Sequence, residues 1–226
     1  MRFQPIAAGA PLTRTPNEKV PIMRSWLSLA ILIPVCAAAQ TPSTLSRTDE
    51  IRLARSAAPP EITKDARIYV LDHDHFVVAD PGHSVMSCMV TRTGPASIEP
   101  QCGDAEADAT VLAVDRFRTE QRLAGRSGPE IEKAISDGLA TGKFHGPKRP
   151  ALVYMMSSMQ ALTDPSGKAI GKWMPHVMVF YPFMRDEDLG LVNTPDPHVP
   201  GTVNAGTALS ALVVVTPGFV DPVTTQ

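Results

Sequence analysis

Residues 66–103, "ARIYVLDHDHFVVADPGHSVMSCMVTRTGPASIEPQCG", decide the fold. β-Branched and aromatic residues come in short runs, a composition typical of strands. Two groups of turn-forming residues, 72–74 and 80–82, separate the first three runs. The stretch therefore predicts three short strands in a meander, with a fourth short pairing near Cys102.

Two helices are expected next. Asp104 can cap a helix that runs to about Leu123, because apolar residues recur there at helical spacing. The sequence "SGPE" that begins at Ser127 is a capping box, in which Ser127 and Glu130 each accept a hydrogen bond from the other's backbone N–H. Gly142 is suited to end this second helix.

The last third of the chain returns to strand-forming sequence. The runs are "PALVYMMSS" at 150–158, "HVMVFYPF" at 176–183 and "LSALVVVTPG" at 209–218. Strands, two helices and strands thus follow one another along the chain. This order predicts an α+β fold, with an antiparallel or mixed sheet and a two-helix layer on one face.

Residues 23–40, "MRSWLSLAILIPVCAAAQ", are typical of a secretory signal peptide. An arginine precedes an apolar run, and small residues follow it, so cleavage is expected after Ala39 or Gln40. The apolar run is shorter than the roughly 20 residues that span a bilayer. We therefore expect export, to the periplasm or outside the cell, without a permanent membrane anchor.

The other boundaries follow from composition. Residues 1–22 are polar and interrupted by prolines, and we expect them to lie disordered upstream of the true start. Residues 41–62 predict a loosely tied N-terminal arm that ends near a double proline. A single α+β domain is expected over residues 63–222, followed by a tail at 223–226.

Cysteine usage fits an oxidising compartment. Cys36 lies in the predicted signal peptide, and Val35 before it disfavours a lipoprotein signal. Removal of that segment leaves Cys88 and Cys102, which predict a disulfide. Their spacing differs from the Cys-x-x-Cys of reactive dithiols.

Charge excludes one class of partner. The chain has 21 basic and 23 acidic residues, of which the first 40 residues hold four basic and one acidic. The rest of the chain therefore has 17 basic and 22 acidic residues and a net charge of −5. Binding to nucleic acid requires concentrated positive charge, so no nucleic-acid partner is expected. The expected partner is an extracytoplasmic ligand or protein of unknown identity.

The histidines of "LDHDHF" form the first candidate metal site. His73 and His75 are two residues apart, which places both imidazoles on one face of a strand, and His83 across the next turn is a possible third ligand for zinc or another transition metal. The alternative is a solvated hairpin turn, for which Asp and His are common residues.

The second candidate lies in "WMPHVMVF". On a strand, Met174, His176 and Met178 share a face, and thioethers beside an imidazole suit copper. The alternative is ordinary core packing, since methionine fills cores and a strand histidine usually makes a structural hydrogen bond.

Catalytic motifs are weak. Ser157 and Ser158 end a strand but lack a nucleophile elbow, and no carboxylates stand at a spacing that indicates glycoside hydrolysis. A carboxylate pair formed by residues distant in sequence stays open. The basic run "KFHGPKRP" at 143–150 is interpreted as a linker, with an anion-binding role as the alternative.

Several pieces of the chain resemble a family of exported bacterial proteins of unassigned function. These pieces are "ARSAAP" at 54–59, "SCMV" at 87–90, "PQCGD" at 100–104, "GKFHGPKRPALVYMMS" at 142–157 and "PHVMVFYP" at 175–182. The resemblance implies a secreted domain and supplies no catalytic residues. We therefore expect a non-catalytic binding or interaction module without a cofactor. The alternative is a metal-dependent enzyme or copper-binding protein.

Overall fold

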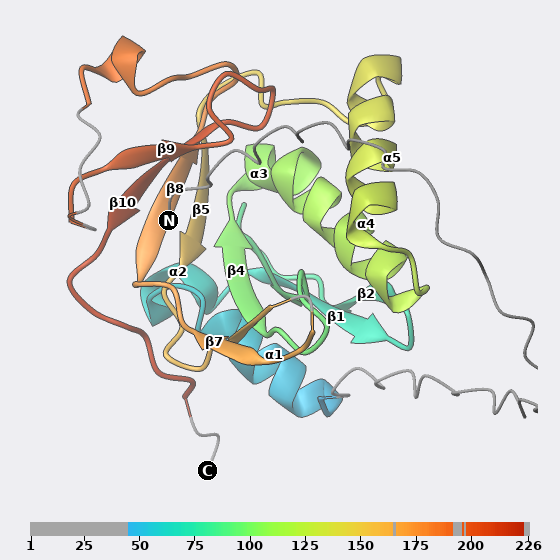
Figure 1. Cartoon of the computed structure of the whole chain (residues 1–226). Helices are drawn as coiled ribbons and strands as arrows, with labels where there is room; N and C mark the ends of the chain where they lie inside the picture. The colour runs from blue at the N-terminus through green and yellow to red at the C-terminus, as the bar shows by residue number, and fades with distance from the viewer. Residues whose placement is uncertain (1–44, 165, 192–195, 197, 224–226) are drawn as a thin grey trace, which may run out of the picture. The chain divides into compact units, whose positions relative to one another are not determined.

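The computed structural model describes residues 45–164, 166–191, 196 and 198–223 (Figure 1). The described residues belong to one compact unit. The predicted signal peptide and Cys36 lie outside the described residues. Within the described ranges, no helix is long and apolar enough to cross a membrane.

An eight-stranded mixed sheet forms the centre of the fold, in the order β2-β1-β3-β4-β5-β8-β10-β9. Neighbouring strands are antiparallel except for β1 and β3, which are parallel. The strands are β1 Arg67–Asp72, β2 His75–Asp80, β3 Ser87–Thr91, β4 Glu99–Gly103, β5 Ala151–Met155, β8 His176–Phe180, β9 Gly201–Val203 and β10 Ala211–Val215. Strands β6 Leu162–Thr163 and β7 Ala169–Gly171 form a separate two-stranded ribbon. The α+β fold class is confirmed.

The predicted meander is wrong in one respect, because β3 pairs with β1 and not with β2. The connection from β2 passes the start of β1, where His83 N–H donates to Asp65 O (2.8 Å). Gly82 has φ +60° there, and a Cβ atom on it would lie 2.4 Å from Arg67 N. Only glycine fits this close approach of two backbone segments.

The predicted disulfide between Cys88 and Cys102 is present. The two residues lie directly opposite each other in β3 and β4, and both are fully buried. The fourth short pairing expected near Cys102 is β4 itself. The bond therefore joins two central strands of the sheet beneath a layer of apolar side chains.

The helices are α1 Arg47–Arg55, α2 Pro60–Thr63, α3 Ala105–Ala109, α4 Val111–Leu123 and α5 Gly128–Thr141, with a 3-10 turn η1 at Glu187–Leu189. Helix α5 has the predicted capping box, and Gly142 ends it with φ +79°. Asp104 caps α3 by accepting from Ala107 N–H (2.8 Å). The single helix expected after Asp104 is wrong, since Thr110 leaves helical geometry and divides it into α3 and α4.

The loosely tied N-terminal arm is also a wrong prediction. Its residues form α1 and α2, and Leu53 and Ala54 of α1 are buried against β1, β3 and β4. Glu50 of α1 forms an ion pair with Arg92 just after β3, with both side chains buried. Ala54 of α1 and Ala57 and Ala58 just after it are fully buried in the core that α1 shares with the sheet. The polar composition of residues 41–62 did not indicate this packing.

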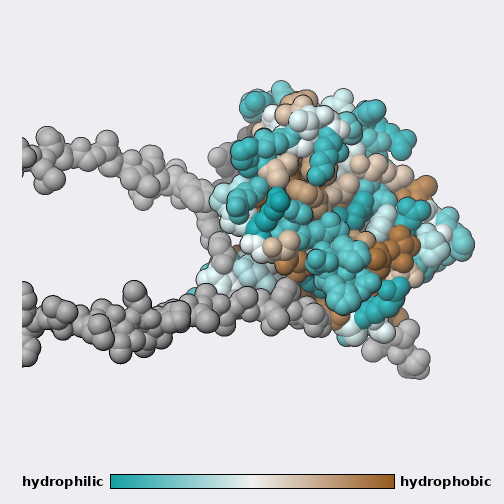
Figure 2. Space-filling view, turned by 90° about the vertical axis from the view of Figure 1, so that its right-hand side faces the viewer, coloured by the Kyte–Doolittle hydropathy of each residue, from teal (hydrophilic) through white to brown (hydrophobic). Residues whose placement is uncertain are grey.

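Helices α3, α4 and α5 lie on the other face of the sheet (Figure 1). This helix layer corresponds to the layer predicted on one face, whereas α1 on the opposite face was not expected. The side of the domain that carries α5 is mainly hydrophilic, with apolar residues in small areas between (Figure 2). The helices cover the β1–β5 half of the sheet, and β8, β10 and β9 extend beyond them (Figure 1).

Candidate functional site

A pocket of about 610 Å³ lies where helix α4 meets the face of the sheet formed by β4, β5, β8 and β10. Val199, residues 201–204 and Leu209 are also part of its wall. A pocket of this size with a largely apolar lining is typical of small-molecule sites. Apolar lining residues include Val111, Val114, Phe180, Leu209, Val213 and Val215.

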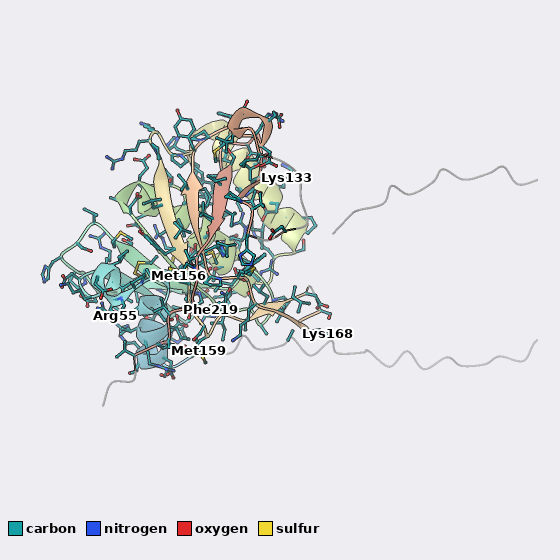
Figure 3. All side chains as sticks on the ribbon, turned by 90° about the vertical axis from the view of Figure 1, so that its left-hand side faces the viewer. Arg55, Lys133, Met156, Met159, Lys168 and Phe219 are labelled. Carbon is teal, nitrogen blue, oxygen red and sulfur yellow. A yellow bond between two sulfur atoms is a disulfide. The ribbon has the colours of Figure 1, made fainter. Side chains whose placement is uncertain are left out.

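Strand alternation accounts for the pocket floor. His176, Met178 and Phe180 occupy alternate positions of β8 and therefore point to the same face, which is the pocket face. Met155 of β5 lies directly opposite His176, and Val213 of β10 lies opposite Met178. Three adjacent strands thus present their side chains to one cavity; Figure 3 views the domain from the side where these strands lie.

Polar side chains gather at one end of the pocket. Glu99 and Gln101 come from alternate positions of β4, and Asp115 and Arg118 come from adjacent turns of α4. Gln101 Nε2 donates to Asp115 Oδ2 (3.2 Å), and Arg118 forms an ion pair with Asp115. Arg118 also donates from Nε to Glu132 Oε1 (2.8 Å). We call Glu99, Gln101, Asp115 and Arg118 the acidic end.

Glu99 is the least solvated acid at this end, with 5 % of its surface exposed. Burial raises the pKa of its carboxyl above the usual range, against the opposing effect of hydrogen bonds from Ser97 and Thr93. Thr93 N–H donates to Glu99 Oε1 (3.2 Å), and within the described residues Glu99 forms no ion pair. Burial also raises the pKa of Asp115, although the Arg118 guanidinium opposes the shift.

Three methionines and a histidine also line the pocket. His176 is 7 % exposed, and its Nδ1 lies 2.6 Å from Met174 O. Burial lowers the pKa of the imidazole. The predicted group of Met174, His176 and Met178 does border one cavity, although Met174 precedes β8 and is not on the strand. Met155 joins them, and sequence spacing gave no sign of it.

The first candidate metal group lies at the tip of the β1–β2 hairpin. His73 has φ +59°, and its imidazole is hydrogen-bonded to Asp72, just as that of His75 is to Asp74. The side chains of His73 and His75 are 90 % and 58 % exposed. In the part of the chain that the structure describes, no three His, Cys, Asp or Glu residues are grouped to hold a metal ion. These contacts are those of a solvated turn.

The serines at the end of β5 have structural partners. Ser157 is buried, and its hydroxyl is 2.6 Å from that of Ser56 next to α1. The Ser158 hydroxyl donates to Asp221 near the end of the described chain. These contacts tie β5 to α1 and to the C-terminal segment.

The basic run at 143–150 packs along the helices. Lys143 Nζ lies 4.5 Å from the centre of the Phe117 ring, and Phe144 packs on the same ring at 5.1 Å. Arg149 Nε donates to Glu106 Oε2 (3.1 Å). These contacts are those of the predicted linker.

No family model, curated protein or solved structure matches the chain. Function is therefore inferred from the pocket itself. The acidic end was not predicted from the sequence. The one sequence signal for it is that Glu99 and Gln101 are two residues apart, a spacing that places both polar side chains on the same face of a strand.

Proposed function

We propose that this domain binds a small molecule with an apolar body and a head group that donates hydrogen bonds, and that an amine is the head that fits best. The observation that carries this proposal is Glu99, a buried carboxyl that pairs with no cation among the described residues and lies at one end of an otherwise largely apolar pocket.

The apolar part of the pocket suits a hydrocarbon body. Valine, methionine and phenylalanine side chains of β5, β8, β10 and α4 contribute to its wall. Transfer of a ligand's apolar surface from water to such a wall contributes roughly 25 cal/mol per Å². Burial of apolar surface contributes to affinity but selects little between ligands. The polar end of the pocket must therefore determine which head group binds.

The acidic end has more acceptors than donors. Its one cation, Arg118, is already paired with both Asp115 and Glu132. A ligand carboxylate would meet the oxygens of Glu99 and Asp115, whereas an ammonium group would donate to them. An ammonium would also stabilise ionised Glu99, whose pKa is raised in the absence of such a partner.

We further propose that the protein is exported. A disulfide between buried strands is expected in oxidising compartments and is rare in the cytosol. The signal-like sequence at 23–40 and the resemblance to exported bacterial proteins point the same way. The ligand is accordingly sought outside the cytoplasm.

A second candidate function is acid–base catalysis at the acidic end. Two carboxyl groups with raised pKa border one pocket, and such shifts are a recurrent property of catalytic acids. An enzyme would convert its ligand, whereas a binding module would release it unchanged. Recovery of the bound molecule after prolonged incubation separates these two outcomes.

Titration calorimetry with octylamine, octanol and octanoate tests the binding proposal. The three probes share a hydrocarbon tail and differ in the head. Octylamine should bind most tightly and octanoate least. Glu99→Gln should remove this preference for the amine while keeping affinity for octanol.

Val213→Phe and Val214→Phe provide a matched pair of variants. Val213 lines the pocket, and Val214 is the next residue on β10, on the opposite face and 37 % exposed. Phenylalanine at 213 should block all three probes, and phenylalanine at 214 should leave binding unchanged. Equal binding of amine and carboxylate, or equal effects of the two variants, would contradict the proposal.

A further inference from the structure

We propose that the pocket also contains a copper(I) site, formed by the imidazole of His176 and the thioethers of Met155 and Met178, with Met174 at its edge. All four residues line the same cavity. The proposal rests on these side chains and not on the ligand proposed above.

The sheet brings the three main donors together. Met155 and His176 are directly opposite each other in antiparallel strands, a relationship that places Cβ atoms about 4.5–5.5 Å apart. Met178 follows two residues later on the same face of β8. Methionine has three rotatable side-chain bonds, so both sulfur atoms can adjust around an ion next to the imidazole.

The hydrogen bond of His176 fixes which nitrogen is available. Met174 O can only accept, so the Nδ1 atom 2.6 Å away carries the proton. In a neutral imidazole the lone pair is then on Nε2, where it is available to bind an ion. Metal-binding histidines usually have such a carbonyl partner on the second nitrogen.

The donor set selects the ion. Thioethers are soft ligands that favour copper(I), while zinc, calcium and magnesium prefer thiolate, imidazole or oxygen donors. Binding of Cu⁺ to neutral thioethers and a neutral imidazole adds one positive charge and releases no proton.

Core packing alone explains other methionines better than these. Met89 is fully buried, packs in the core and is not part of the pocket lining. Met155 and Met178 also contact this core cluster, but unlike Met89 they line the cavity, as does Met174. Their side chains therefore have room for an ion that Met89 lacks.

Competition of the purified, untagged protein with a chromogenic copper(I) chelator, under reducing and oxygen-free conditions, tests the proposal. One Cu⁺ per chain is expected. His176→Ala, and separately Met155→Leu combined with Met178→Leu, should each weaken binding about tenfold or more. Leucine keeps the volume of methionine, so the double variant should stay folded.

Three further measurements control this experiment. Met159→Leu changes a half-exposed methionine outside the pocket, in the segment that follows β5 (Figure 3), and should leave affinity unchanged. His75→Ala tests the hairpin histidines and should also have no effect. Zn²⁺ should not compete at equal concentration.

The proposal is overturned if no Cu⁺ binds, if His75→Ala or Met159→Leu weakens binding as much as His176→Ala, or if Zn²⁺ displaces the ion. X-ray absorption of the loaded protein gives an independent reading, since two sulfur neighbours and one nitrogen neighbour are expected. A spectrum with only nitrogen and oxygen neighbours would contradict it. Loss of amine binding in the calorimetric test would leave this result unaffected.

Discussion

Gln101 on β4 donates a hydrogen bond from Nε2 to Asp115 Oδ2 on α4, at 3.2 Å, and the same nitrogen donates to Thr91 Oγ1 on β3 at 2.7 Å. One buried amide therefore connects two strands and the helix at the acidic end of the pocket. This connection holds α4 at a fixed position relative to the sheet. The acidic end is thus preorganised before a ligand arrives.

Gln101→Leu tests that connection. The substitution removes the donor and leaves Asp115 and Thr91 with an acceptor unsatisfied, which should cost about 1–3 kcal/mol of unfolding free energy. Urea denaturation measures this cost. A change below about 0.5 kcal/mol, typical of surface positions, would show that the amide does not anchor the helix.

Glu99→Gln should change how stability depends on pH. Burial raises the pKa of Glu99 above its ordinary 4.5, so the folded protein holds this proton more tightly than the unfolded chain. The stabilisation that comes from this tighter proton binding is fully present at a pH below the pKa of Glu99 in the unfolded chain. It is lost as the pH rises through the pKa of Glu99 in the folded protein. Glutamine mimics the protonated acid at every pH. The variant should match the parent protein below pH 4.5 and exceed its stability at neutral pH, as measured by thermal unfolding across pH. Lower stability of the variant at neutral pH would refute the raised pKa.

Removal of the disulfide should destabilise the domain without changing its fold. Replacement of Cys88 and Cys102 by alanine opens a loop of about 15 residues, worth roughly 3 kcal/mol by the chain-entropy model. Denaturation of the parent protein with and without reductant should give a similar difference. Free thiols in protein isolated from its native compartment would contradict both the bond and the proposed export.

Helix α1 should be an integral part of the fold. Leu53→Ala removes a side chain that is 4 % exposed and should cost about 2–5 kcal/mol. Arg47→Ala on an exposed position of the same helix should change stability by less than about 0.5 kcal/mol. Equal small effects would mean that the helix is only loosely attached.

Local signals predicted local structure well. The capping box at Ser127, the N-cap at Asp104 and the disulfide of Cys88 with Cys102 all depend on residues close in sequence, and all three are confirmed. The prediction for residues 41–62 was wrong because the burial of Leu53 depends on strands that lie further along the chain.

The pocket was harder to predict for the same reason. Met155 and His176 are 21 positions apart, and only the pairing of β5 with β8 brings them together. Glu99 lies near Asp115 because Gln101, two residues along β4, is hydrogen-bonded to Asp115 of α4. No motif spacing contains either relationship, so both appear only in three dimensions.

A crystal structure of the protein with octylamine tests the central claim most directly. We expect the hydrocarbon tail of octylamine to lie against Val213 and Phe180, with its nitrogen within hydrogen-bonding distance of the Glu99 carboxyl. An amine bound elsewhere, or a cavity closed by the protein's own side chains, would contradict it.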